Sequence, residues 1–428
     1  MPGTARLSWV DIALIVLFLI GIYTNYTIPI SKNVPIPSIP AGVAGLILLW
    51  RRRDQISRAG LMAFILVIAL YTVSILCAPD LNFLPRRTNG LIQLVYSMTI
   101  GYALFLTVTL GSRNQIAGLF LGCALTLAIG CLLETYGGLR PISDSVRSVL
   151  YSRGFYDGDL RDLTYYDRVR PKFFASEPSS VTFCYSLFTF LWLVASSSRW
   201  KLILYGLLFA LGIAAMPGPT LLLMLILAAP YLVFLASRSG GKVNFARLIP
   251  NAAACLLCAG AVLLVAQTVF VERNRDAQSG NDPSAFYRVR GPALAGIDIM
   301  SSMPFGAGLT GEPFIQDRVT NLYLRSPAYS SAWPVVHPAS ELLINYFWLH
   351  WIYLGLVPGL ILIAAISYWL TTLGVPSPAF CWVVWAILGQ ASGAYVGPTC
   401  WGVLFLAAAV AVLNQRTTSK TWLLKAVD

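Results

Sequence analysis

Residues that could carry chemistry gather in a long polar stretch, Phe286 to Glu341, of an otherwise apolar chain. This stretch contains Arg288, Arg290 and His337, which is one of only two histidines. The planar, permanently charged guanidinium of arginine binds phosphate oxygens in two-pronged fashion. A neutral imidazole can act as a general base. Arg288 and Arg290 are therefore either ligands of a phosphate group or solvated loop charges, and His337 is a candidate for proton transfer.

His337 is the leading candidate for the base. It precedes Pro338, and an apolar run opens just after it, so we expect the imidazole at the positive end of a helix, which disfavours imidazolium. Glu341 lies four residues further on and could reach His337 if the helix begins there. The alternative is an interfacial histidine satisfied by a backbone carbonyl. His350, inside the apolar run, is predicted to be structural or to face the bilayer.

A second polar stretch ends in the sequence RVRPKFFASEPSSVTF. Its cations Arg168, Arg170 and Lys172 come just before an apolar run. The Glu177-Pro178 pair is typical of a helix start with proline at the first helical position. Glu177 is therefore either a second candidate base or a carboxylate that caps the helix. The cations either bind substrate or anchor to lipid phosphates.

Composition and hydropathy define the elements that must position these residues. The chain is 57% hydrophobic and 11% charged, whereas a soluble domain carries about 25% charged residues. Apolar runs of spanning length recur throughout and predict an all-α, polytopic membrane protein, a single domain over 1–428 with about twelve spans. One predicted run, Ala339 to Leu370, is longer than one crossing needs, so we expect its start to project from the bilayer. Two loops, 135–176 and 271–338, interrupt the spans, and Ala293 to Met300 is predicted to be an interfacial helix.

Lysine and arginine are unevenly placed among the short connections. An even number of spans puts most of these connections, and both termini, in the cytoplasm, and the two long loops outside. The stretches 140–177 and 272–341 are close to neutral, so the net charge of +12 lies mostly elsewhere. The basic balance therefore indicates membrane orientation and not a nucleic-acid partner. The chain has no His-x-His or glycine-rich nucleotide motif, so no metal site is predicted.

Two motifs resemble those of the O-antigen polymerase and ligase superfamily. The first is an outside arginine, an apolar patch, Pro-Phe-Gly-Ala-Gly, a histidine and then Gly-Leu-x-x-Gly-Leu. It corresponds to Arg288, Pro304 to Gly308, His337 and Gly355 to Leu360. The second is RPKFFASEPSS, matching at Arg170, Phe174, Glu177, Pro178 and Ser179. Lys172 and Phe173 stand where this family usually has a small residue.

The resemblance implies a metal-independent glycosyltransferase without cofactor, on the periplasmic face of a bacterial inner membrane. Donor and acceptor would be glycan repeat units on undecaprenyl diphosphate, within membrane lipid, with a chain-length regulator as a further partner. Arg288 would stabilise the departing diphosphate, with His337 as the first and Glu177 as the second candidate base. The candidate substrate-binding residues are Arg170, Lys172, Arg290, Arg168, Tyr287 and Glu341.

Two other functions stay open. A ligase would transfer the glycan to a different acceptor, but the His337-Pro338 pair differs from the His-Asn pair of that branch and favours the polymerase. A transporter of lipid-linked oligosaccharides would show ionisable residues at mid-membrane and repeated halves. Mid-span charges are scarce in this chain and no internal repeat is convincing, which favours surface chemistry.

Overall fold

Helices form most of the structure, a computed structural model that describes residues 6–31, 34–151, 156, 158–239, 242–243, 245–329 and 338–425. The helices of the bundle are α1 (Trp9–Thr24), α2 (Ile39–Arg51), α3 (Arg58–Cys77), α4 (Leu84–Leu110), α5 (Arg113–Tyr136), α8 (Pro178–Ala195), α9 (Lys201–Ala215), α10 (Leu222–Pro230), α11 (Phe245–Thr268), α17 (Tyr346–Leu354), α18 (Leu356–Thr372), α19 (Pro378–Gly389) and α20 (Pro398–Lys425). Short helical turns at Arg53–Gln55, Leu81–Phe83, Pro219–Leu221 and Tyr231–Ala236 adjoin them. Two small hairpins pair β1 (Ile28–Ser31) with β2 (Val34–Ile36) and β3 (Arg238–Ser239) with β4 (Lys242–Val243).

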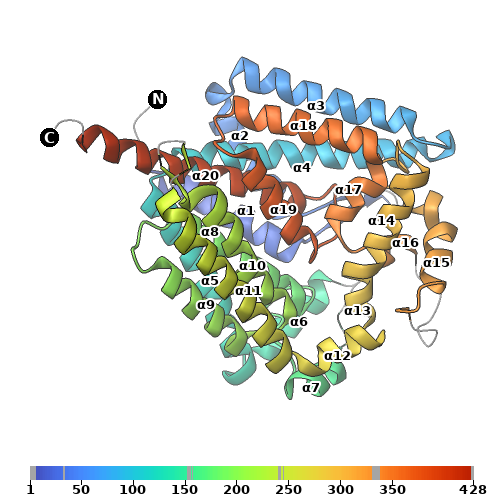
Figure 1. Ribbon diagram of the computed structural model, residues 1–428. Coiled ribbons are helices and arrows are strands. Elements are labelled where there is room, and N and C mark those ends of the chain that lie inside the picture. The colour runs from blue at the N-terminus through green and yellow to red at the C-terminus, as the bar shows by residue number, and fades with distance from the viewer. Residues whose placement is uncertain are drawn as a thin grey trace.

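The two predicted loops also contain helices. The first holds α6 (Arg140–Leu150) and α7 (Asp159–Tyr166). The second holds α12 (Val271–Ser279), α13 (Pro283–Ala285), the π-helical turn η5 (Phe286–Arg290), α14 (Gly291–Ser302), the 3-10 turn η6 (Glu312–Ile315), α15 (Gln316–Leu324) and α16 (Ala339–Leu342). In Figure 1 these elements gather away from the two chain termini. The predicted helix at Ala293 to Met300 is confirmed by α14.

The core lies around α20, which packs between α4 and α8. On one side α4 contacts α2 and α3, and α3 packs on α18; on the other side α8 contacts α5, α9 and α10. The apolar stretch of α8 is almost completely buried, whereas α11 exposes Leu256, Leu257, Leu263 and Leu264. An exposed apolar helix of this kind is unfavourable in water and favourable in lipid.

Seven helices in the described chain are long and apolar enough to cross a membrane, or eight when the bent pair α17–α18 counts as one span. Four further apolar helices, α1, α2, α9 and α19, are shorter. The architecture is that of an all-α membrane protein, as the composition predicts.

The predicted single run from Ala339 to Leu370 is wrong, because the structure breaks it into α16, α17 and α18. The bend between α17 and α18 is 118°. Gly355 lies at this bend with φ of +69°, and a Cβ there would approach Pro304 O to 2.3 Å. The Pro304–Gly308 loop occupies the break, where Ala307 N donates to Ile352 O (2.9 Å) and Gly308 N donates to Tyr353 O (2.8 Å). The break therefore keeps its carbonyls hydrogen-bonded, as a buried interruption must.

Basic residues connect the helices at the end of the bundle that lies opposite the two long loops. Asp11 pairs with Arg51 and Arg52 at the start of α1. Arg113 donates to the last carbonyls of α8, including Ala195 O at 2.6 Å, and Arg416 donates to Thr109 O. Cations at helix C-termini satisfy orphan carbonyls and complement the helix dipole. The basic residues that predict the membrane orientation therefore also stabilise the contacts between helices at this end.

Candidate functional site

The two polar loops meet at a pocket of about 270 Å³, called here the arginine pocket. Four guanidinium groups are among its lining residues, namely Arg161, Arg170, Arg273 and Arg288. Two of them come from the first loop and two from the second. Such a concentration of cations around one cavity suits an anionic ligand.

Glu177 stands at the wall of this pocket, as the residue before the first turn of α8. Its backbone is extended (φ −147°, ψ 158°) and Pro178 begins the helix, so the predicted helix start is confirmed. The capping interpretation is wrong, because the Glu177 side chain makes no capping hydrogen bond. Its Oε1 instead accepts from Arg288 Nη2 at 3.1 Å and from the Ser179 hydroxyl. Arg288 Nη2 also donates to Ser179 Oγ at 3.1 Å.

This three-residue contact joins positions more than 100 residues apart in the sequence. The Glu177 side chain remains 40% exposed and that of Arg288 16% exposed. Arg288 Nε is buried and has no hydrogen-bond partner within the described chain. Both side chains therefore keep capacity for a ligand while they hold each other in place.

The segment before Glu177 is held in a strained conformation. Phe173 and Phe174 both have positive φ, +35° and +65°, which costs on the order of 1–3 kcal/mol for each such residue. The buried carboxylate of Glu134, on α5, accepts the N–H groups of Lys172 (2.9 Å) and Phe173 (2.5 Å). Lys172 and Phe173, which replace the usual small residue of the motif, therefore belong to a fixed turn that sets the position of Glu177.

A second buried side chain, Arg147 on α6, holds the next part of this segment. It donates to Ala175 O at 2.7 Å and to Ser176 O at 3.1 Å, and its Nη1 pairs with Asp144. Glu134 and Arg147 are positioning residues that the sequence motifs did not identify. The one available signal was a carboxylate near the end of an apolar run.

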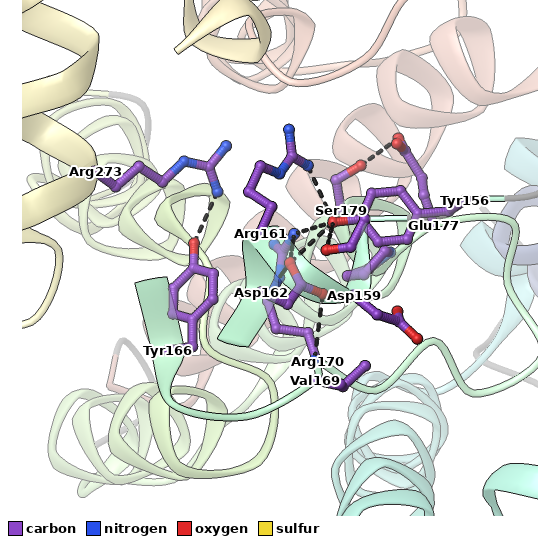
Figure 2. A network of polar contacts seen from close by, with 12 residues as sticks. Tyr156, Asp159, Arg161, Asp162, Tyr166, Val169, Arg170, Glu177, Ser179 and Arg273 are labelled. Carbon is purple, nitrogen blue, oxygen red and sulfur yellow. Dashed lines mark hydrogen bonds and ion pairs between the residues drawn. The ribbon is translucent and has the colours of Figure 1, made fainter. Parts of the chain in front are cut away.

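Arg170 lies in the wall of the arginine pocket, but its charge is already paired with a buried carboxylate. Its guanidinium is buried, donates to Asp162 Oδ1 at 2.8 Å and to the Tyr156 hydroxyl at 3.0 Å, and stacks on the Tyr166 ring. Figure 2 shows this network around Asp162. Burial alone would lower the pKa of Arg170, but neighbouring Tyr166 and Asp162 raise it, so the group stays charged. Its role in this geometry is to organise α7 and the turn that follows it.

Arg273 and Arg161 line the pocket although no motif pointed to them. Arg273 donates to Asp282 (2.9 Å) and to the Tyr166 hydroxyl (2.7 Å), which links α12 to α7 (Figure 2). Burial lowers the pKa of Arg273, but Tyr166 and Asp282 more than offset this and raise it. Arg161 donates to the Tyr156 hydroxyl at 3.0 Å. Only the folded contact between the loops could reveal these two cations.

The backbone of Arg288 is fixed by the interrupted helix of the C-terminal half. Asn345, which caps α17, donates to Arg288 O at 2.6 Å and to Gln390 Oε1 at 2.9 Å. Ile344 N donates to Tyr287 O at 3.2 Å. The break before α17 thus supplies hydrogen bonds that a continuous helix would have kept for itself.

Two other predicted cations of the first loop lie outside the pocket lining. Lys172 is buried against Asp159 at 2.8 Å. Arg168 donates to the Tyr136 hydroxyl at 2.5 Å and to Ala214 O, at the end of α9, at 2.7 Å. Both make structural contacts that explain their positions without a substrate.

The remaining predicted residues of the second loop divide into three cases. Arg290 and Glu341 are exposed and do not line the pocket. Tyr287 packs in an aromatic cluster, with its ring 6.4 Å from that of Tyr323 and nearly parallel to it. His337 lies outside the described residues. Buried His350 contacts the Tyr395 hydroxyl (2.9 Å) and Gly359 O (3.2 Å), which fits its predicted structural role.

A second pocket, of about 440 Å³, shares Glu177 and Ser179 with the arginine pocket. It is called here the hydroxyl pocket, because serine, threonine and tyrosine hydroxyls dominate its polar lining. It lies among the ends of α1, α17 and α19 and the starts of α8 and α20. Glu177 is therefore accessible from two cavities of different chemistry.

No protein-family model, no curated protein and no solved structure matches the chain. Within the described residues, no group of three or more His, Cys, Asp or Glu is placed to hold a metal ion. The eight cysteines are free thiols, including Cys255 and Cys258 on α11.

Proposed function

We propose that the protein is a membrane-embedded glycosyltransferase that polymerises glycan repeat units carried on undecaprenyl diphosphate. The observation that carries this proposal is the contact of Arg288 with Glu177 and Ser179 at the edge of a four-arginine pocket. This contact supports the proposal because it joins a carboxylate, which could act as a base, to a cluster of cations of the kind that binds diphosphate. The same residues carry the resemblance to the O-antigen polymerase and ligase superfamily.

The chemistry follows from these positions. The acceptor hydroxyl oxygen forms a bond to the anomeric carbon of the donor sugar while its proton passes to the Glu177 carboxylate. The bond from that carbon to the diphosphate oxygen breaks, and the diphosphate keeps the electron pair. Arg288, together with Arg161 and Arg273, stabilises the charge that develops there. His337 remains a competing candidate for the base.

The membrane arrangement is part of the proposal. The four shorter apolar helices would cross together with the longer ones and the bent pair, which makes twelve spans. Both termini would then lie in the cytoplasm, and both loops and the arginine pocket would lie on the periplasmic face of the inner membrane. Single cysteines at Ser148 and Ser326, in a background without the native cysteines, test this: labelling from the cytoplasmic side alone would reverse the orientation.

Reconstitution tests the activity directly. Purified protein with lipid-linked repeat units should produce a ladder of longer lipid-linked glycans, in the presence of EDTA as in its absence. Arg288→Ala at the same protein concentration should produce at least about 100-fold less of this ladder. Wild-type protein that yields no product longer than the substrate, although the same substrate is elongated in native membranes, would reject the proposal. Elongation only when a different acceptor is added would identify a ligase.

Two observations favour a second candidate, a transporter of lipid-linked oligosaccharides. The α17–α18 break and buried His350 are features that transporters use at mid-membrane. In vesicles that hold fluorescent lipid-linked glycan, a transporter would move substrate between leaflets without changing its length. The polymerase would lengthen it without moving it.

A further inference from the structure

The hydroxyl pocket contrasts with the arginine pocket in charge. No lysine, arginine or histidine is among its described lining residues, which carry two carboxylates, Glu177 and Glu312. Its hydroxyl groups come from Tyr23, Ser176, Ser179, Ser180, Thr310, Ser340, Tyr353, Ser392, Tyr395 and Thr399. A phosphate would meet two carboxylates there and no cation among the lining residues, whereas a sugar would meet many hydrogen-bonding partners.

Glu312 provides the sharpest feature of this pocket. It is 8% exposed, and its Oε1 accepts from the Tyr353 hydroxyl. Its Oε2 is buried with no hydrogen-bond partner in the described chain, and the guanidinium of Arg86 lies 3.6 Å from it. Leaving a buried carboxylate oxygen without a hydrogen-bond donor costs free energy. A sugar hydroxyl supplies such a donor.

Tyrosines give the pocket a rigid aromatic wall. The Tyr395 hydroxyl is held by His350 (2.9 Å) and by the Tyr71 hydroxyl (2.5 Å), and the Tyr353 ring meets the Tyr395 ring edge to face. Aromatic rings with a fixed polar edge suit ligands that combine apolar faces with hydroxyl groups, as sugars do.

We propose that the hydroxyl pocket binds the sugar end of the acceptor, with Glu312 accepting a hydrogen bond from one of its hydroxyl groups. This inference rests on the proposed function and places the donor diphosphate in the arginine pocket. Glu177, which lines both pockets, then faces the acceptor hydroxyl on one side and the leaving group on the other. The acceptor is recognised as an uncharged glycan without a phosphate at the bound end.

Binding measured without turnover tests this assignment. Two probes are titrated into purified protein: the repeat-unit oligosaccharide released from its lipid by mild acid, and inorganic diphosphate. Glu312→Gln keeps the shape of the side chain and removes its charge, so it should raise the Kd of the oligosaccharide about tenfold and leave the Kd of diphosphate unchanged. Arg273→Gln should do the reverse. Glu272→Gln, an exposed carboxylate outside both pockets, is the matched control and should change neither.

Wild-type oligosaccharide affinity in Glu312→Gln would overturn the assignment. If that variant loses both probes, it has lost its fold, and the near-isosteric Thr399→Val with Ser180→Ala decides. Weaker oligosaccharide binding in this pair supports the pocket, and unchanged binding rejects it. Failure of the proposed function has a different signature, because wild-type protein would then form no glycosidic bond whatever the binding of either probe.

Discussion

The turn at 170–177 and the turn at 286–290 look equally basic in sequence, but they differ in how their charges are balanced. In the first turn, Arg170 and Lys172 are buried against Asp162 and Asp159. In the second, Arg288 has one ion pair, to a carboxylate that is itself 40% exposed, and a buried Nε without a partner. The cations of the first turn are fixed in buried ion pairs, whereas Arg288 in the second turn is paired with a carboxylate that remains partly exposed.

This difference shows that the burial of its acidic partner, and not the sequence motif around it, decides whether a cation is available to bind a ligand. A buried pair such as Arg170–Asp162 has already exchanged hydration for a fixed partner, and breaking it is expensive. The Arg288–Glu177 pair is open to the arginine pocket, where a diphosphate can compete for the guanidinium. Ligand binding would then release Glu177 to accept a proton.

The largest effect should come from Glu177→Gln. Loss of a general base typically lowers the rate by about 10²- to 10⁴-fold, so we expect about a 1,000-fold loss of glycan elongation. The thermal unfolding temperature should change little, because the side chain caps no helix. Initial rates from purified variants, with Glu272→Gln as the control, measure this. Wild-type elongation by Glu177→Gln would transfer the role of base to His337, to be tested as His337→Ala.

The buried side of the comparison is tested by Asp162→Asn. The Arg170 charge would stay in the protein interior without its carboxylate, which we expect to lower the free energy of unfolding by about 3 kcal/mol. Chemical denaturation of the protein in detergent, followed by tryptophan fluorescence, checks this. Asp317→Asn, an exposed acid on α15, is the control. Equal stability of the two variants would mean that Arg170 is free for substrate after all.

The open side is tested by Arg288→Lys. Lysine keeps the charge but lacks the planar fork that binds phosphate oxygens in two-pronged fashion, so elongation should fall about 100-fold, nearly as far as in Arg288→Ala. Stability should be close to wild type, because the side chain is partly exposed. Elongation rates and melting curves on the same preparations separate the two effects. Elongation within threefold of wild type in the lysine variant would show that the positive charge alone is sufficient.

Much of the fold could be predicted from the sequence because membrane spans follow from local hydropathy. The start of α8 at Pro178 and the helix α14 could also be predicted, since proline and glycine act on the backbone locally. The break between α17 and α18 was not. It depends on the Pro304–Gly308 loop, about fifty residues earlier, which supplies hydrogen bonds to the end of α17.

The candidate site was only partly predictable for the same reason. Glu177 and Arg288 were identified by motif, and the structure brings them together. Arg273 and Arg161 belong to the pocket through contacts between loops that no local pattern encodes. Lys172 and Arg168 were chosen for their charge, but their partners Asp159, Tyr136 and Ala214 are set by packing between elements.

The smallest effect should come from Arg290→Ala, which makes the comparison sharpest because Arg290 is two residues from Arg288. Both belong to the same π-helical turn and carry the same charge, so a diffuse attraction for an anionic lipid would affect them alike. Arg290 is exposed and outside the lining of either pocket. We therefore expect elongation within about twofold of wild type, the range of a weak surface-charge effect.

Elongation assays at low and at raised salt distinguish the cases: a diffuse effect of Arg290 would disappear as salt screens it, while the loss in Arg288→Ala would persist. A loss in Arg290→Ala as large as that in Arg288→Ala would show that the whole turn binds the diphosphate and that pocket geometry does not select the cation.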